Sequence, residues 1–96
     1  MASASRLGDI GGSHDACPAR PIITAGDDVF INGRGAARYQ DQLAVHSCFI
    51  HPPHPGNIAG GSTTVFINGR AAARIGDAVS CGGQLAEGSH NVFIGD

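Results

Sequence analysis

Hydrophobic residues along this chain of 96 residues gather in short runs, and two of the runs belong to nearly identical segments. The first segment is DVFINGRGAARYQD (28–41), and the second is TVFINGRAAARIGD (64–77). A partial third copy, NVFIGD (91–96), stands at the end of the sequence, and SRLGD (5–9) matches the other half of the unit. The chain therefore reads as three units, each running from an Arg-Xaa-Xaa-Asp corner to a Val-Phe-Ile strand.

Each Val-Phe-Ile run predicts a short β-strand, because β-branched and aromatic residues are enriched in strands. The Asn-Gly pair that follows is a strong signal for a tight hairpin turn. The next segment, Arg-Xaa-Ala-Ala-Arg, has the length of a return strand and is too short for a stable helix. We predict an all-β fold, a small conical domain of three repeated short β-hairpins with pseudo-threefold symmetry. Such symmetry suits a trimeric partner, although internal duplication alone would also produce it.

Composition limits the core of this predicted domain, which we assign to residues 1–96 as one unit. Fifteen glycines and five prolines favour turns, while four phenylalanines and one tyrosine leave few large side chains for the interior. A chain of this size buries only about two thirds of its unfolded surface. A bound metal or a partner chain would supply the missing stability.

Charge and hydropathy exclude several classes of function. The formal charge is −2 and no cluster of basic residues occurs, which argues against nucleic-acid binding. The sequence lacks both the apolar segment of a secretion signal and the roughly 20 apolar residues of a membrane helix. We therefore expect a protein that is made and folded in the cytoplasm. Three cysteines in such a chain favour metal ligation or free thiols over disulfides.

Histidine and cysteine recur at matching places in the three units. His14 and His46 each lie five residues after a corner aspartate, and Cys81 lies four residues after one. Counted back from the valine of the next Val-Phe-Ile strand, His54 and Cys81 both lie eleven residues away. We predict that His14, His46, His54 and Cys81 bind a structural zinc ion near the axis, since four mixed nitrogen and sulfur ligands close such a site.

The remaining histidines and cysteines have other predicted roles. The stretch VHSCFIHPPHPG (45–56) is interpreted as an enlarged loop of the middle unit, in which His51 is the leading substitute for His54. Cys17 and Cys48 are expected to be buried thiols, and His90 a surface residue. The alternative for the whole set is loop histidines that bind no metal.

An enzymatic role is the alternative to this structural one. A Cys/His pair oriented by an aspartate could form a small zinc- or thiol-dependent hydrolase. However, Asp9, Asp41 and Asp77 occur in the same context in every unit, which is typical of residues that serve the fold. We expect them to accept backbone N–H groups or to pair with arginines. No zinc-enzyme or phosphate-loop motif is present, so we expect no enzymatic activity. A metal-binding or redox-sensing module is the third alternative.

The segments RLGD…H, VFINGRGAAR, VFINGRAAARIGD-AVSCGG and GSHNVFIGD resemble the PAAR-repeat proteins. The motif Pro-Ala-Ala-Arg appears here as GAAR (35–38) and AAAR (71–74), both without the proline. The resemblance implies a conical β domain whose apex holds a zinc ion through three histidines and one cysteine.

The same resemblance implies a function. It indicates a non-enzymatic spike-tip protein that caps and sharpens the trimeric VgrG spike of a type VI secretion system, with one cone per trimer. Such a protein aids membrane piercing, contacts the target membrane transiently and can carry effector proteins. The machine would export it into a target cell or the extracellular space. Related cones also tip contractile phage tails, so the parent machine stays open between the two.

Overall fold

The computed structural model describes residues 2–13, 18–48, 51–80 and 82–95, and for residues 46–48 and 51–55 it describes the backbone. This part of the chain consists of strands, bridges and turns, and it contains no helix of the length and hydrophobicity needed to cross a membrane. The strands are β1 (Ala2–Ser3), β2 (Ile10–Gly11), β3 (Arg20–Pro21), β4 (Phe30–Ile31), β5 (Arg34–Gly35), β6 (Gln42–Cys48), β7 (His51–Asn57), β8 (Phe66–Ile67), β9 (Arg70–Ala71) and β10 (Phe93–Ile94). The predicted all-β class is confirmed.

The strands pair antiparallel in five two-stranded sheets. Strand β4 pairs with β5 and β8 with β9, and each pair is joined by the predicted Asn-Gly turn. Both turn residues have positive φ, 54° and 77° at Asn32–Gly33 and the same values at Asn68–Gly69. A type I′ hairpin turn requires this combination, which asparagine and glycine adopt most readily. The two predicted hairpins are therefore confirmed.

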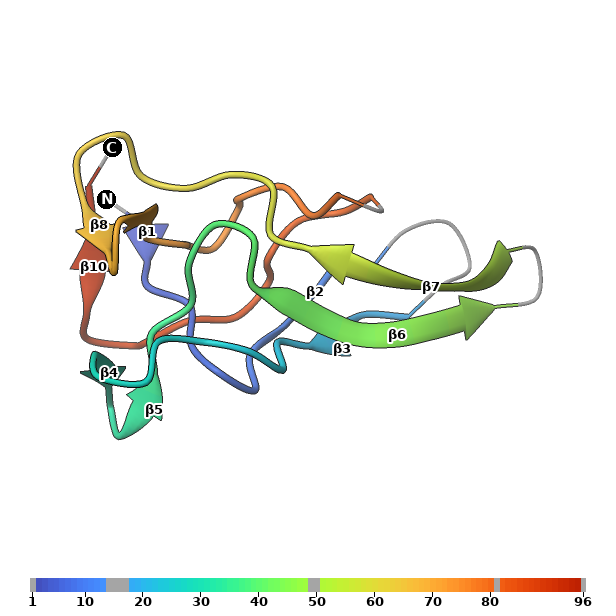
Figure 1. Cartoon of the computed structure of the whole chain (residues 1–96), viewed down its shortest axis with the longest axis horizontal. Coiled ribbons are helices and arrows are strands. Elements are labelled where there is room, and N and C mark those ends of the chain that lie inside the picture. The colour runs from blue at the N-terminus through green and yellow to red at the C-terminus, as the bar shows by residue number, and fades with distance from the viewer. Residues whose placement is uncertain (1, 14–17, 49–50, 81, 96) are drawn as a thin grey trace.

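The third hairpin is built from the two ends of the described chain (Figure 1). Strands β1 and β10 pair through Ala2↔Ile94 and Ser3↔Phe93. This register repeats the pairing of β5 with β4, so the two ends complete the third unit without a connecting turn. The pseudo-threefold arrangement is thus closed by contacts between residues that are about as far apart in sequence as possible.

The return strands are shorter than the sequence predicts. Each Arg-Xaa-Ala-Ala-Arg segment contributes only its first two residues to the hairpin. The third residue, an alanine, pairs with a neighbouring unit instead. Ala36 bridges to Arg6, and Ala72 bridges to Arg38. The prediction of a full return strand is wrong because these alanines are used between units instead of within one.

A ring of backbone hydrogen bonds surrounds the pseudo-threefold axis. The N–H of Ser5 donates to the carbonyl of Ala73, Ala73 to Ala37, and Ala37 to Ser5, each at 3.0 Å. All three residues are fully buried. Small side chains are required here because three segments of chain meet around the axis.

Two apolar clusters fill the interior. The cluster beside the short hairpins takes one alanine and one isoleucine from each unit: Ala4, Ala36, Ala72, Ile31, Ile67 and Ile94. The second cluster contains Ile22, Ala37, Leu43, Ile58, Ala73, Val79 and Leu85. The repeat therefore specifies part of the apolar core as well as the short hairpins.

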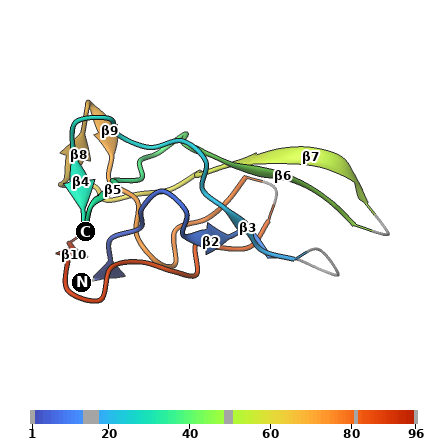
Figure 2. The ribbon, with the colours of Figure 1, turned by 90° about the horizontal axis from the view of Figure 1, so that it is seen from below.

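Strands β6 and β7 form the longest hairpin and extend away from the short hairpins (Figures 1 and 2). The principal extents of the molecule are 36 × 23 × 23 Å. The interpretation of residues 45–56 as a loop is therefore wrong. The prolines of β7 are tolerated because a two-stranded ribbon has only edge strands, on which some N–H groups need no ladder partner.

Candidate functional sites at the two ends of the domain

Each Arg-Xaa-Xaa-Asp corner is closed by hydrogen bonds between its own arginine and aspartate. At the first corner the backbone N–H and Nε of Arg6 donate to Asp9 Oδ2 at 2.8 and 2.9 Å, and Nη2 donates to Oδ1 at 3.0 Å. The corners of Arg38–Asp41 and Arg74–Asp77 repeat all three bonds. The predicted structural role of the aspartates is confirmed, since they accept backbone N–H groups and also pair with arginines.

The corner arginines also reach the neighbouring hairpins, at the turn in two of them and at the residue after β10 in the third. Nη1 of each one donates to an oxygen there, in the pairs Arg6–Asn32 (3.0 Å), Arg38–Asn68 (3.1 Å) and Arg74–Gly95 (2.8 Å). Hydrogen bonding to Asp9 raises the pKa of Arg6 above its ordinary value, and the bond to Asp41 does the same for Arg38, against the opposing effect of desolvation. These cations therefore remain charged at any ordinary pH and hold the hairpins to the corners.

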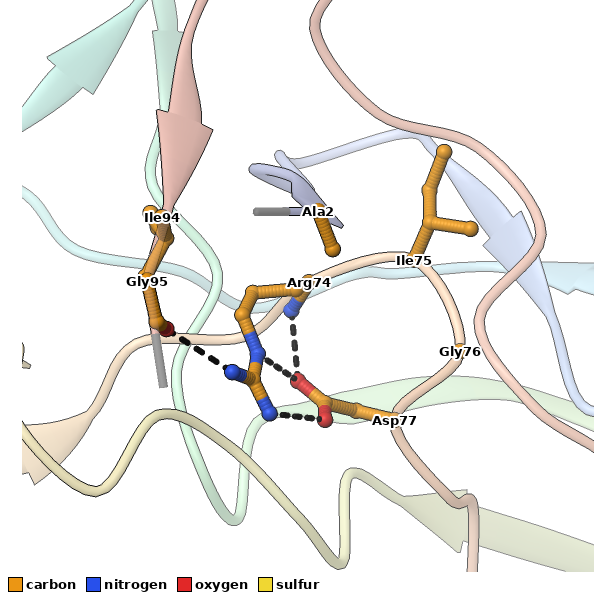
Figure 3. Close-up of a pocket in the computed structure, with 7 residues that line it drawn as sticks. All are labelled: Ala2, Arg74, Ile75, Gly76, Asp77, Ile94 and Gly95. Atoms are coloured by element: carbon orange, nitrogen blue, oxygen red, sulfur yellow. Dashed lines mark hydrogen bonds and ion pairs between the residues drawn. The ribbon is translucent and has the colours of Figure 1, made fainter.

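In the first corner and in the second, an additional arginine from the adjoining hairpin also contacts the aspartate. Arg34 Nη2 donates to Asp9 Oδ1 at 2.9 Å, and its Nε donates to the carbonyl oxygen of Leu7. Arg70 makes the same contacts with Asp41 (3.3 Å) and Tyr39. These roles were missed in the sequence, although the repeated Asn-Gly-Arg was a usable signal. Figure 3 shows the third corner, which lacks such an arginine among the described residues.

Apolar side chains are exposed at one end of the molecule, in three sets of equivalent positions. We call this surface the hairpin end, because its members lie on the short hairpins, directly precede them in sequence, or donate backbone N–H groups to them. The phenylalanines of the three units are 61, 60 and 50% exposed. The members are Phe30, Phe66, Phe93, Val29, Val65, Val92, Leu7, Tyr39 and Ile75. Exposed apolar surface with a regular arrangement is typical of a protein–protein contact.

The opposite end carries strands β6 and β7, and we call it the histidine end. The backbone register makes His46 and His54 directly opposed residues, while His51 opposes Cys48. His14, Cys17 and Cys81 lie outside the described residues, as do the side chains of His46, Cys48, His51 and His54. The predicted ligand set therefore stays a prediction. Among the side chains that are described, no three histidines, cysteines or acidic residues form a group that could hold a metal.

The described neighbours of His14 and Cys81 lie close together. Gly83 has no room for a side chain, because a Cβ there would collide with the carbonyl oxygen of Ser13. Ser80 exchanges hydrogen bonds with Asn57, at the end of β7, at 2.8 and 3.0 Å. The described backbone segments next to the predicted ligands His14, His54 and Cys81 thus approach one another at the histidine end. His90 lies elsewhere and is exposed, as predicted.

Comparison with known proteins agrees with this architecture. The family model described as PAAR motif matches residues 12–87. One relative, the double-stranded DNA deaminase toxin A of Burkholderia cenocepacia (strain H111), is 39% identical over 73 residues. The match covers 76% of this chain and 5% of the relative, so the chain spans only a small part of the length of that protein. Since the family match extends over most of the repeat-bearing sequence, this chain belongs to the PAAR motif family.

Proposed function

We propose that this protein is a non-enzymatic spike tip that caps the trimeric VgrG-like spike of a type VI secretion system. The observation that carries the proposal is the hairpin end, where the same apolar side chains recur three times and stay exposed. A trimeric spike offers three equivalent surfaces at its tip, and each unit would cover one of them. Apolar burial at about 25 cal/mol per Å² would drive the contact.

The construction of the domain suits a mechanical role. Backbone hydrogen bonds join the three units around the axis, and each corner aspartate pairs with the arginine that holds its corner to a hairpin. A tip that pierces a membrane must transmit force from its base to its apex without local unfolding. The described aspartates of the three corners are all used in these contacts, which is consistent with a protein without catalytic function.

We propose further that His14, His46, His54 and Cys81 bind a structural zinc ion at the histidine end. Directly opposed residues of an antiparallel pair share a face of the sheet, so the register supports His54 over His51 as the partner of His46. The contact between Ser13 and Gly83 supports the approach of the other two positions. When bound, zinc would cross-link three segments of chain at the apex.

Delivery of effector proteins is a second part of the proposal. Support comes from the relative named as a deaminase toxin, in which a segment similar to this chain makes up 5% of the whole. A module of this kind therefore occurs within a toxin. We propose that the spike tip carries a toxin-class effector during export by the secretion machine.

Binding to a purified trimeric VgrG-like spike tests the proposed function. The variant with Phe30, Phe66 and Phe93 all changed to serine should keep its fold, because these side chains are exposed, and should lose binding at least tenfold. His90→Ala, which alters another exposed side chain, serves as the matched control and should bind like the parent. Equal binding by the parent and the triple variant would contradict a docking role for the hairpin end, as would the absence of any complex with the parent.

A further inference from the structure

The third corner differs from the other two in its contacts with the adjoining hairpin strand. In the first two units Arg34 and Arg70 pair with Ile31 and Ile67 across their hairpins, and they bend back over the corner. In the third unit Ala2 holds the equivalent position, because it pairs with Ile94 in the same register. The structure thus repeats the corner three times but supplies the second arginine only twice.

The acceptors for that arginine are still in place. In the first corner, Arg34 uses the carbonyl oxygen of Leu7 and Oδ1 of Asp9. Their equivalents in the third corner are the carbonyl oxygen of Ile75 and Oδ1 of Asp77. Within the described residues no donor to the Ile75 carbonyl is found, and Asp77 Oδ1 accepts one bond, from Arg74 Nη2 at 2.9 Å.

Open space marks the position of the missing guanidinium. A pocket of about 360 Å³ lies between the third corner and the ends of β1 and β10 (Figure 3). A Cβ built on Gly8 would lie 3.1 Å from Arg34 Nη2, whereas a Cβ on the equivalent Gly76 meets no described atom within 4 Å. Among the described residues, the pocket is therefore the counterpart of the space that Arg34 fills in the first corner.

The chemistry of the pocket selects its ligand. A carboxylate oxygen and a carbonyl oxygen, the same pair of acceptors that Arg34 uses in the first corner, match the Nε–H and Nη–H donors of a planar guanidinium. An ammonium group lacks this fork, and an anion would be repelled by Asp77. The side chain of Ile75, 38% exposed, offers an apolar wall to the methylene stem of an arginine.

We propose that the third corner is a guanidinium-binding site, and that an arginine side chain of a partner protein fills it. Ile75 belongs to the hairpin end, so a protein that covers this end can reach the pocket. That this partner is the spike rests on the proposed function, whereas the binding chemistry does not. The site would add one polar anchor to an otherwise threefold apolar contact.

Titration of the isolated chain with ethylguanidinium, followed by the amide NMR signals of Gly76 and Gly95, tests the proposal. We expect saturable shifts at millimolar concentrations, and binding at least tenfold weaker for ethylammonium. Ala2→Arg supplies the missing side chain within the chain and should abolish the saturable shifts. Ala59→Arg, which adds the same charge at an exposed alanine, is the matched control and should bind ethylguanidinium like the parent.

Several results would overturn the proposal. Shifts that do not saturate, or equal affinity for ethylammonium, would exclude a guanidinium site, and neither comparison depends on a variant that folds. Unchanged binding by Ala2→Arg would place the site elsewhere. Free arginine binding tenfold more tightly than N-acetylarginine amide would indicate a free amino acid as the ligand instead of a protein side chain. Because the spike is absent from this experiment, its failure would leave the proposed spike binding untouched.

Discussion

The hairpin end and the histidine end use the same threefold repeat in different ways. At the hairpin end every apolar position occurs three times, and the exposures of equivalent residues agree closely, as for Phe30 at 61% and Phe66 at 60%. At the histidine end, within the described parts of the chain, only the middle unit contributes a hairpin with two seven-residue strands, β6 and β7. Repetition suits contact with a symmetric partner, whereas the proposed zinc site would draw unlike ligands from the units, with two histidines from the middle one. The two proposed functions thus make different demands on the symmetry of the repeat.

The largest effect should follow from loss of a proposed zinc ligand at the histidine end. His46→Ala should reduce zinc from about one ion per chain to a small fraction, since a structural zinc contributes about 10–16 kcal/mol of apparent binding free energy. Hydrogen exchange should accelerate in β6 and β7 much more than at Ser5 and Ala73 on the axis. Metal analysis and exchange on the same samples check both effects.

His90→Ala provides the matched histidine deletion, because His90 is exposed and lies outside the predicted ligand set. This control should retain the zinc content and exchange pattern of the parent. Equal zinc content in His46→Ala and His90→Ala would remove His46 from the proposed site.

A corner aspartate should be the next most sensitive position. Asp41→Ala removes a buried carboxylate and leaves Arg38 and Arg70 without their common partner, which should cost about 3 kcal/mol of unfolding free energy. The raised pKa of Arg38 means that the stability contributed by its own ionisation is present below the ordinary arginine pKa and is lost only in strong alkali. Chemical denaturation measures the change, with the exposed Asp27→Ala as control. A loss no larger than that of the control would contradict the role of the corner.

A larger side chain should be tolerated less well at the pseudo-threefold axis than on the surface. Ala37→Val adds two methyl groups where three chain segments meet, and overpacking of this kind costs about 1–3 kcal/mol. Ala59→Val makes the same change at an exposed alanine and should shift stability by less than about 0.5 kcal/mol. Thermal unfolding of the two variants gives the comparison, and equal midpoints would show that the axis is not closely packed.

The smallest predicted effect is a gain. The third residue of each corner has a positive φ, 89° at Gly8, 76° at Gln40 and 94° at Gly76. Of these three residues, Gln40 is the one that carries a side chain, and a positive φ is strained for such a residue. Gln40→Gly should therefore stabilise the protein by up to about 1 kcal/mol. Gln42→Gly is the control, because residue 42 lies in β6 outside the positive-φ positions and glycine there should destabilise. A loss of stability in Gln40→Gly would contradict the strain.

The sequence predicted those parts of the fold that depend on local signals. Val-Phe-Ile followed by Asn-Gly specifies a hairpin through β propensity and turn conformation, and both complete copies have the expected backbone. The roles of Asp9, Asp41 and Asp77 followed from their repetition. Closure of the third hairpin by β1 and β10 could not be predicted in this way, because it joins residues without a turn between them.

The structure of the histidine end was harder to predict, because it too depends on strand pairing that local sequence signals do not specify. Three prolines between His51 and Gly56 indicated a loop, although an isolated two-stranded ribbon accommodates them. The register of His46 with His54 depends on irregularities in the pairing of β6 with β7, which have no signature in the residue spacing. The pocket of the third corner likewise emerges only when Ala2 is placed opposite Ile94.

The mass of the complex with a purified trimeric VgrG-like spike tests the central claim most directly. One chain with three units should cover one trimer, so the measured mass should equal three spike subunits plus one copy of this 9.7 kDa protein. This ratio should hold when the protein is in excess, because the hairpin end occupies all three equivalent surfaces at once. A complex with three copies per trimer, or no complex, would contradict the account.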